Sequence, residues 1–437
     1  MGVTDEIPGR IAYINAQIID PATDTDVPGY LLTDGEKIID VGAGPFNDNL
    51  PKDMEVIDCN GSCLAPGLVD IRVQTGEPGQ EHKETLATAG RAAVSGGITS
   101  MICLPNTDPV IDDMSTLEFI ARRARLHGLA KVYCYGAVTK DLEGSVLAEM
   151  GLLAESGAVA FTDGLKSVSN AQIMRRALEY ASTFGFLIVQ HAEEPALAHG
   201  GMMNAGETAT RLGLAGIPRF AEVIMVERDI RLAEMTGARL HFAHLSTSEA
   251  LAAVRRAKSS GLEVTCDTAP PYFALNELAV GDYRTFAKLS PPLRTEADRQ
   301  AVIAGLIDGT IDAIASDHMP EDEESKRLPF AEAAYGGTGL ETLLPVTLEL
   351  VHNQYMEFLA AINLITYKPA QLMGIKAGRL APEEAADLVI FDPNIGWRVT
   401  EERLHSKSKN SPFDGRPVQG QVLRTVVDGR TVFVRES

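Results

Sequence analysis

The 437-residue sequence lacks several features, and each absence excludes a class of protein. No run of 18 apolar residues occurs, so we expect no membrane-spanning segment. The start, MGVTDEIPGR, has no apolar core, so we expect no signal peptide. Positive charge is scarce, with 39 Lys and Arg against 60 Asp and Glu and a net charge of −21. This balance argues against nucleic acid and anionic membranes as partners.

Cysteine is also scarce, and its five positions show no Cys-x-x-Cys spacing. This pattern predicts reduced, buried thiols in a cytoplasmic protein rather than a disulfide or metal framework. Charged residues make up 23% and hydrophobic residues 45%, as in ordinary globular proteins. The length allows one large domain and a smaller one.

The order of apolar segments predicts an α/β fold. Residues 11–63 alternate short apolar strands with turns, and a strand–loop–helix rhythm then repeats. Eight strands with helices between them predict a (β/α)₈ barrel over residues 64–375. The pattern returns to β from residue 376, so residues 1–63 and 376–437 are predicted to form one small β domain. The predicted barrel strands cover residues 68–73, 99–104, 131–138, 158–162, 187–191, 239–245, 262–268 and 311–317.

The stretch PGLVDIRVQTGEPG, residues 66–79, reads as a buried strand followed by a turn. Because side chains alternate along a strand, Asp70, Arg72 and Gln74 share one face and would point into a closed barrel. Two interpretations follow from this stretch alone. The three polar groups form either a site or a plug in which Asp70 pairs with Arg72.

Four metal-compatible side chains fall at the ends of separate predicted strands, namely Asp163, His191, His244 and Asp317. Catalytic groups of a (β/α)₈ barrel lie at the carboxyl ends of its strands. A single histidine there would be read as structural, but four such residues together predict a site. His318, next to Asp317, would point away from it. The acidic run at residues 321–324 predicts a solvated loop.

Ordered blocks across residues 10–434 resemble dihydroorotases of the bacterial type, in the amidohydrolase superfamily. The resemblance implies a (β/α)₈ barrel with a β-sandwich built from both chain ends. It also implies reversible cyclisation of carbamoyl aspartate to dihydroorotate with one or two zinc ions. Besides the His191 segment, the blocks are PGLVDIRVQTGEPGQEHKET, MICLPNTDP, GAVAFTDG, HFAHLSTSEAL, LSPPLRTEADR, ASDHMP, RLPFAEAAYGGTGLET and KNSPFDG.

Five positions depart from the family pattern, and we call them the departing positions. The first strand of the family reads Asp-x-His-x-His followed by Leu-Arg-Glu-Pro-Gly, in which both histidines bind metal and the arginine binds the substrate carboxylate. Here a guanidinium, which cannot bind zinc, an amide and a glycine replace these three groups. Two further substrate contacts, an asparagine and a histidine, are also replaced. The departing positions are Arg72, Gln74, Gly76, Ser290 and Glu321. The chain thus resembles the degenerate subgroup that lacks the metal-binding His-x-His.

Five other positions match the family, and we call them the retained positions. The resemblance assigns Asp163 to the bridging position, His191 and His244 to metal ligands, Asp317 to the proton-transfer base and Asn106 to substrate contact. Asp163, His191 and His244 could still hold a single zinc, whereas the two-zinc site is not expected. We also hypothesise that the Arg72 guanidinium replaces zinc by forming salt bridges with Asp163 and Asp317.

Three functions remain open at this point. We favour a non-catalytic or strongly impaired protein that supports aspartate carbamoyltransferase structurally, as dihydroorotase-like chains without the metal histidines do. The second is an active single-zinc dihydroorotase. The third is a small-molecule binding protein that takes a pyrimidine precursor through Asn106 and the 336–339 loop. The resemblance also leads us to expect an oligomer.

Overall fold

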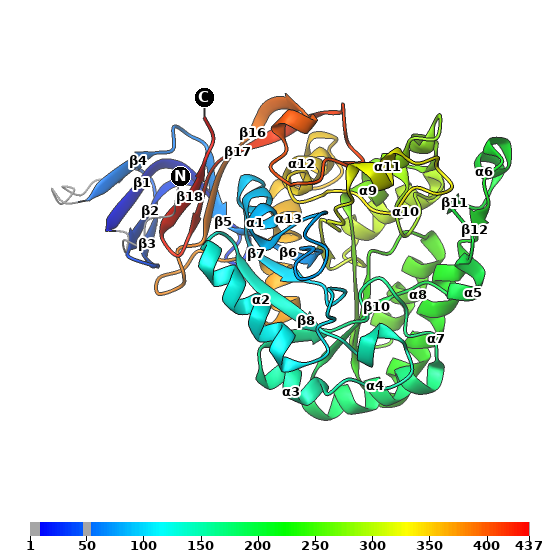
Figure 1. Ribbon diagram of the computed structural model, residues 1–437. Coiled ribbons are helices and arrows are strands. Elements are labelled where there is room, and N and C mark those ends of the chain that lie inside the picture. The colour runs from blue at the N-terminus through cyan, green and yellow to red at the C-terminus, as the bar shows by residue number, and fades with distance from the viewer. Residues whose placement is uncertain (1–8, 47–53, 437) are drawn as a thin grey trace.

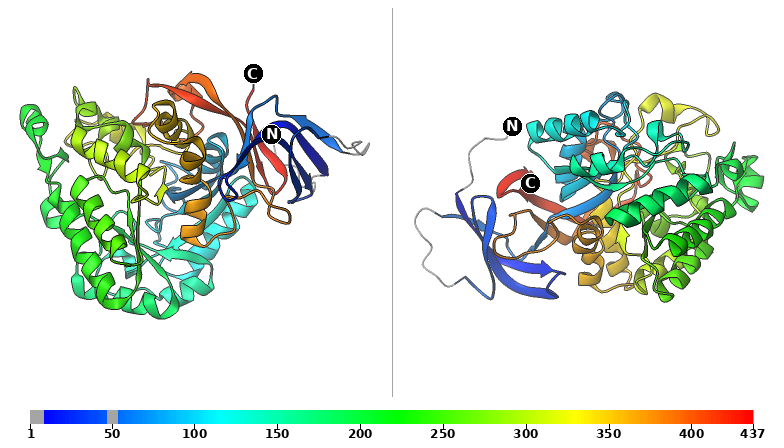
Figure 2. Two further views of the ribbon diagram at one scale, coloured as in Figure 1. Left: turned by 180° about the vertical axis from the view of Figure 1, so that it is seen from behind. Right: turned by 90° about the horizontal axis from the view of Figure 1, so that it is seen from below.

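The chain forms a parallel barrel with a β-sheet domain at one side, and both chain ends lie in that domain (Figure 1). This architecture is seen in a computed structural model that describes residues 9–46 and 54–436. The two parts remain distinct when the molecule is viewed from behind and from below (Figure 2). The fold class predicted from the sequence is confirmed.

The barrel sheet holds eight parallel strands in the order β15-β14-β13-β10-β9-β8-β7-β6. The parallel bridge between Val73 and His318 brings the two ends of this sheet together, because the backbone N–H of Gln74 donates to the carbonyl of His318 at 2.9 Å. The strands are β6 Leu68–Val73, β7 Ile98–Cys103, β8 Lys131–Gly136, β9 Ala158–Phe161, β10 Leu187–His191, β13 Arg239–Ala243, β14 Val264–Thr268 and β15 Ala313–Ile314. The predictions for β6 and β10 are exact, and the last predicted strand is five residues too long.

Helices surround the barrel, and their ends follow from local chemistry. Helix α4 begins after Asn170, whose side chain accepts hydrogen bonds from the N–H groups of Gln172 and Ile173, and ends at Gly185, which has φ +72°. The principal helices are α1 Leu86–Ser95, α2 Met114–His127, α3 Met150–Glu155, α4 Ala171–Phe184, α7 Phe220–Thr236, α8 Ser248–Ser259, α10 Glu296–Ile307 and α12 Leu343–His352.

Shorter elements fill the connections between strands and helices. The short helices are α5 Pro195–Ala198, α6 Glu207–Leu212, α9 Pro270–Ala274, α11 Glu323–Arg327, α13 Phe358–Asn363 and α14 Tyr367–Met373, and the short strands are β11 Met203–Asn204 and β12 Gly216–Ile217. Helix α11 begins within the acidic run at residues 321–324, so the prediction of a loop is wrong for Glu323 and Glu324, although both side chains are exposed to solvent as predicted.

The second sheet joins the two ends of the chain in the order β18-β17-β16-β5-β1-β2-β3, with β4 paired to β1. Antiparallel pairing of β5 with β16 connects the N-terminal and C-terminal strands. Its strands are β1 Arg10–Asp20, β2 Thr25–Asp34, β3 Lys37–Ala43, β4 Glu55–Asp58, β5 Cys63–Pro66, β16 Leu388–Arg398, β17 Pro417–Val427 and β18 Arg430–Val434. Strand β5 spans the predicted boundary between residues 63 and 64.

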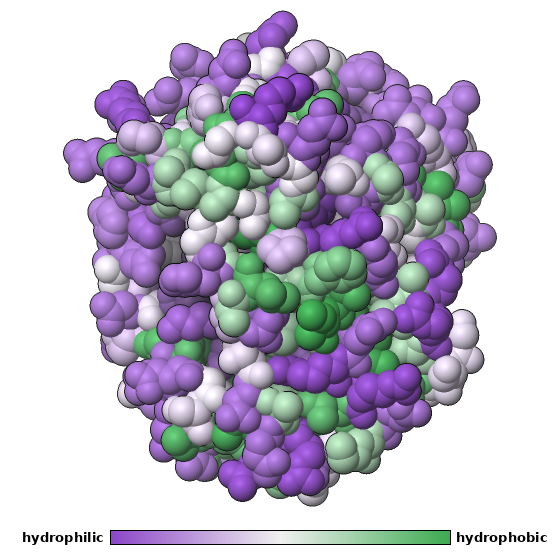
Figure 3. All heavy atoms as spheres, turned by 90° about the vertical axis from the view of Figure 1, so that its right-hand side faces the viewer, coloured by the Kyte–Doolittle hydropathy of each residue, from purple (hydrophilic) through white to green (hydrophobic). Residues whose placement is uncertain are grey.

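The outer face near α5 and α7 shows where apolar side chains reach the surface. They gather near the middle of this face among hydrophilic ones (Figure 3). Leu197 on α5 and Phe220 and Ile224 on α7 are exposed. These groups therefore lie on the surrounding helices. Among the described residues, every helix is too short or too polar to cross a membrane.

Candidate functional site

The carboxyl ends of the barrel strands bring the predicted site residues to one mouth. Arg72 lies within β6, His191 ends β10, and Asp317 follows β15. The side chains of Arg72, His191 and His244 are all at most 2% exposed. These four polar groups come from four separate strands, and their contacts decide what the site can do.

The Arg72 guanidinium occupies a buried position between two strand ends. Its Nε donates to Asp317 Oδ1 at 3.0 Å, and its Nη2 donates to the carbonyl of Gly164 at 3.1 Å. The predicted salt bridge with Asp317 is therefore present. The alternative pairing of Arg72 with Asp70 is wrong, because Asp70 accepts from the backbone N–H groups of Arg72 and Ser316 instead. Arg72 thus links the first and last strands by a charge-assisted hydrogen bond.

The chain of contacts continues from Asp317 through both imidazoles. Asp317 Oδ2 lies 3.0 Å from His244 Nδ1, and His244 Nε2 lies 2.8 Å from His191 Nδ1. Burial lowers the pKa of His244 to about 4, and the neighbouring Arg72 charge acts in the same direction. Neutral His244 therefore donates through Nδ1 to the carboxylate and accepts at Nε2 from His191.

Asp317 remains ionised although it is enclosed. Burial would raise its pKa, but His244 and Arg72 hold that pKa at about 2. The two carboxylate oxygens are each engaged, one by the guanidinium and one by the imidazole. Asp317 therefore acts here as the anionic centre of a buried ion-pair cluster.

Asp163 faces a different set of partners. It accepts hydrogen bonds from the backbone N–H groups of Val138 and Thr139 at 3.0 and 2.9 Å and from Thr139 Oγ1 at 2.5 Å. Its pKa is raised because burial outweighs these contacts. The second half of the hypothesised cluster, a contact between Arg72 and Asp163, is replaced by the contact of Arg72 with the Gly164 carbonyl.

Two more departing positions also contact neighbours at the mouth. Gln74 Oε1 accepts from Asn106 Nδ2 at 3.0 Å, while Asn106 Oδ1 is buried without a partner. Glu321 is only 5% exposed and forms an ion pair of 3.0 Å with Lys83. This pair attaches the loop at residues 320–328 to the loop after β6, which corrects the expectation of a solvated acidic run.

Gly76 occupies a turn that no larger residue fits. Its φ is +67°, and an added Cβ would lie 2.6 Å from the carbonyl oxygen of Glu84 and 2.9 Å from that of Gln80. Both neighbouring atoms belong to the backbone, so they cannot move as a side chain would. The backbone around position 76 therefore leaves no room for the arginine of the family pattern.

The free space at the mouth is small. One cavity of about 10 Å³ is lined by Ser290 and Asp317, among others, and a second of about 10 Å³ by Gln74, Gly76 and Asn106. Each has room for roughly one water molecule. Neither of these two cavities has space for a pyrimidine precursor.

The donor set does not fit a binuclear zinc centre. Position 72 carries a guanidinium, which has no lone pair to offer. The Nε2 lone pair of His244 is taken by His191, and both oxygens of Asp163 are engaged by residues 138–139. Across the described part of the chain, no group of three or more His, Cys, Asp or Glu side chains is arranged to hold a metal ion.

The backbone at the retained positions is unusual. His244 has φ +41° and Asp317 has φ +52°, in a region that non-glycine residues seldom adopt. Asp267 supports the first of these, since its Oδ1 accepts from the backbone N–H of His244 at 2.6 Å. Such conformations persist where surrounding contacts enforce them and are concentrated at functional sites.

Sequence reasoning missed two residues that matter here, Lys83 and Thr139. Lys83 neutralises Glu321 across 238 positions of sequence, and Thr139 holds Asp163. Neither lies in a catalytic motif, and only the barrel brings each one to its partner. The predicted orientation of His318 away from Asp317 agrees with its contact of 3.6 Å with Glu84.

Comparison with known proteins points to one group. A family model described as "Dihydro-orotase-like" matches residues 61–250, and one described as "Amidohydrolase family" matches residues 338–433. A dihydroorotase of Anaplasma phagocytophilum is 48% identical over 98% of this chain and 96% of its own length. A dihydroorotase of Desulforapulum autotrophicum is 44% identical over 98% of this chain and 99% of its own length.

Solved structures agree on the fold. The L-hydantoinase (dihydropyrimidinase) of Arthrobacter aurescens has a TM-score of 0.86 at 25% identity and covers 98% of this chain and 96% of its own. The dihydropyrimidinase of Brevibacillus agri has a TM-score of 0.81 at 23% identity, with coverage of 97% and 95%. At the latter identity, the likeness concerns the fold alone.

Proposed function

Since the chain belongs to the dihydroorotase family of amidohydrolases, we propose that it is a non-catalytic or strongly impaired member of pyrimidine biosynthesis. We propose further that it supports aspartate carbamoyltransferase as a structural partner. The observation that carries the first part is the ion pair between Arg72 and Asp317, which places a permanent cation at the barrel centre.

The state of Asp317 argues against its use as a base. A carboxylate with a pKa near 2 is a weak proton acceptor at neutral pH, because general bases work best with a pKa close to the working pH. Both of its oxygens are also engaged. A substrate proton would have to compete with a guanidinium and an imidazole for this group.

The contacts of the departing positions support the same proposal. Arg72 contacts Asp317, Gln74 contacts Asn106, and Glu321 contacts Lys83. The first two of these pairs join a departing position to a retained one, so groups that would bind metal or substrate are occupied internally. Losing a bidentate arginine clamp at position 76 would itself weaken carboxylate binding by about 2–5 kcal/mol.

The partner is proposed from the resemblance to chains that lack the metal histidines. A chain without turnover is retained for another role, and assembly with the carbamoyltransferase is the role such chains have. Pull-down of the co-expressed carbamoyltransferase with the tagged full chain tests this part. We expect a complex of fixed stoichiometry, and two separate peaks in size-exclusion chromatography would contradict it.

Turnover is tested separately with purified protein, carbamoyl aspartate and dihydroorotate. We expect a rate at background level and substoichiometric zinc by elemental analysis, with an active dihydroorotase as the positive control. Stoichiometric zinc together with measurable turnover would favour the single-zinc enzyme instead. Arg72→His with Gln74→His is the matched gain-of-function variant, and Gly76 is left unchanged because an arginine there collides with backbone.

A further inference from the structure

A second cavity lies beside the barrel mouth, and we propose that it binds a small anion that carries carboxylate or phosphate groups. Its volume is about 300 Å³, compared with about 10 Å³ for each mouth cavity. Ligand sites commonly begin near this size. This site is separate from the Arg72 cluster and does not depend on the proposed loss of catalysis.

Three segments that are distant in sequence form its walls. They are the loop around His82, residues 321–327 with helix α11, and the connection from β16 to β17 at residues 399–416, which we call the strap. The ring of Phe286 adds an apolar wall. The cavity therefore exists only because the strap is attached to the barrel.

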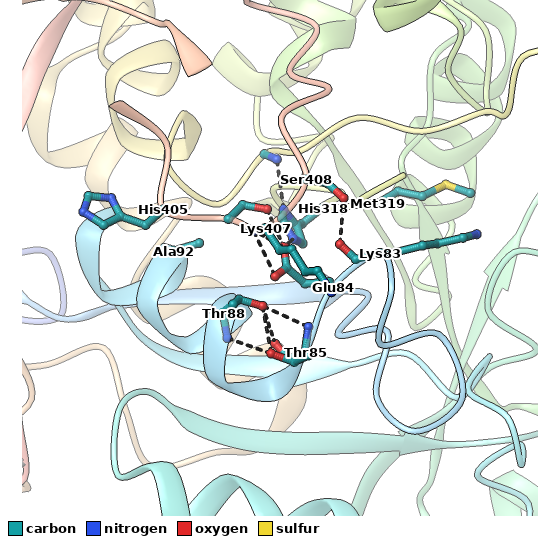
Figure 4. Close-up of polar contacts among 12 residues, drawn as sticks. Lys83, Glu84, Thr85, Thr88, Ala92, His318, Met319, His405, Lys407 and Ser408 are labelled. Atoms are coloured by element: carbon teal, nitrogen blue, oxygen red, sulfur yellow. Dashed lines mark hydrogen bonds and ion pairs between the residues drawn. The ribbon is translucent and has the colours of Figure 1, made fainter. Parts of the chain in front are cut away.

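Two carboxylates fix the strap in place. Glu84, which is fully buried, accepts from the hydroxyl of Ser406 and from the backbone N–H of Lys407 at 3.1 Å. Glu341 accepts from the backbone N–H of His405 at 2.8 Å. Figure 4 shows Glu84 beside Lys407 and His318, with Ser408 close to Lys83. The strap is thus held through its backbone and through the Ser406 hydroxyl, and none of these contacts uses a lysine side chain.

The wall carboxylates are mostly engaged with other groups. Glu321 pairs with Lys83, and Glu323 pairs with Arg327. Asp322 accepts from the backbone N–H of Ser325 at 2.9 Å and so caps α11. Ion pairing therefore neutralises two of the four wall carboxylates that a ligand anion would meet.

The lysines of the cavity lack carboxylate partners. Within the described residues, Lys407 and Lys409 form no ion pair, and each Nζ donates to a single carbonyl, of Glu81 and of Leu404, at 2.5 Å. Each ammonium therefore keeps two free N–H donors. Lys326 contacts only carbonyls at its Nζ. Burial lowers the pKa of Lys326 to about 7, so this lysine adds only part of a positive charge at neutral pH. The two strap lysines thus stand beside two carboxylates without a cationic partner, Asp322 and Glu401.

The free N–H donors of the strap define the ligand class. In a chain with a net charge of −21, Lys407 and Lys409 keep unused ammonium donors at one cavity, and such donors favour a small dianion. A dicarboxylate and a phosphate both provide paired oxygens for these donors. Phe286 would contact an apolar portion of the same ligand.

Isothermal titration of the full chain with inorganic phosphate and, separately, with succinate tests the site. We expect saturable one-to-one binding of at least one probe in low-salt buffer, and weaker binding as sodium chloride is added. The probe that binds distinguishes a phosphate site from a carboxylate site. Absence of saturable binding for both probes would overturn the proposal.

Variants separate this site from general surface charge. Lys407→Gln with Lys409→Gln should weaken binding about tenfold or more, whereas Lys407→Arg with Lys409→Arg should retain it. The control is Lys140→Gln with Lys376→Gln, because both of these lysines are exposed and lie outside the cavity wall. Thermal unfolding of each variant shows that it folds. Equal affinity in the glutamine pair and the wild type would also overturn the proposal.

Discussion

The two sides of the barrel mouth differ in how many of their residues match the family pattern. The side built from the first strand and its loop has changed at Arg72, Gln74 and Gly76, whereas the side built from later strands keeps His244 and Asp317. The changed side now supplies partners to the kept side, as the Arg72–Asp317 contact shows. Contacts with the changed side, such as the one between Arg72 and Asp317, are enough to explain why the kept residues are buried. A catalytic role is not needed for that explanation.

Removal of the central cation should cause the largest loss of stability. Arg72→Ala leaves the Asp317 charge buried without its guanidinium, which costs about 3–5 kcal/mol for a broken buried pair. Urea unfolding at pH 7 measures the change. Arg255→Ala is the matched control, because its pair with Asp308 is about half exposed and is worth at most about 1 kcal/mol. Similar losses in both variants would show that the two sides are not coupled through Arg72.

The kept side should make the protein sensitive to mild acid. His244 has a folded pKa of about 4 against 6.5 in the unfolded chain, so the unfolded state takes up the proton first as pH falls. Stability should therefore decrease by about 3 kcal/mol between pH 6.5 and 4. The pKa of Asp317 is also lowered in the folded protein, from 3.8 to about 2, so its contribution is lost in the same direction but at lower pH, as pH falls from about 3.8 to 2.

Unfolding free energies measured across this pH range test the assignment. His244→Gln should remove most of the decrease between pH 6.5 and 4, whereas His199→Gln, at an exposed position, should leave it unchanged. The slope with pH is compared, rather than the absolute stability, because His244→Gln also removes packing. An unchanged slope in His244→Gln would assign the acid sensitivity to another group.

Closure of the changed side should produce a smaller effect. Gly76→Ala and Gly213→Ala both place a side chain at φ +67°, but only at Gly76 does the new Cβ meet backbone, at 2.6 Å. The shared conformational cost is about 1–2 kcal/mol, and the collision should add about 1–3 kcal/mol at Gly76. Thermal or urea unfolding of both variants measures the difference. Equal losses would mean that the loop after β6 can move away.

The barrel could be predicted because its signals are local. β6 and β10 were predicted exactly from apolar runs bounded by turns, and Gly185 marked the end of α4. The first residues of the helices are predicted less accurately. The spacings Ser115-x-x-Glu118 and Ser246-x-x-Glu249 are each typical of a capping box, yet Asp113 caps α2 and Thr247 caps α8. Several polar residues near each start can accept the N–H bonds, so the sequence does not select one of them.

The candidate site could be predicted in its members but only partly in its contacts. Strand ends placed Arg72, His244 and Asp317 together, and charge complementarity predicted the Arg72–Asp317 pair. Asp163 was assigned to the same cluster, yet residues 138–139 satisfy it. The sequence predicts which residue lies at the end of a strand, but it does not predict the rotamer of that residue's side chain. The rotamer decides which of several nearby groups the side chain contacts.

The turn at Gly76 also bears on how such a chain could regain activity. A substituent there meets two carbonyl oxygens, so an arginine at position 76 alone would strain the turn before any gain from a histidine at position 72 could appear. The loop through Glu84 would need to reopen first, and Glu84 also secures the strap. Restoring the family pattern at position 76 would therefore also disturb the attachment of the strap.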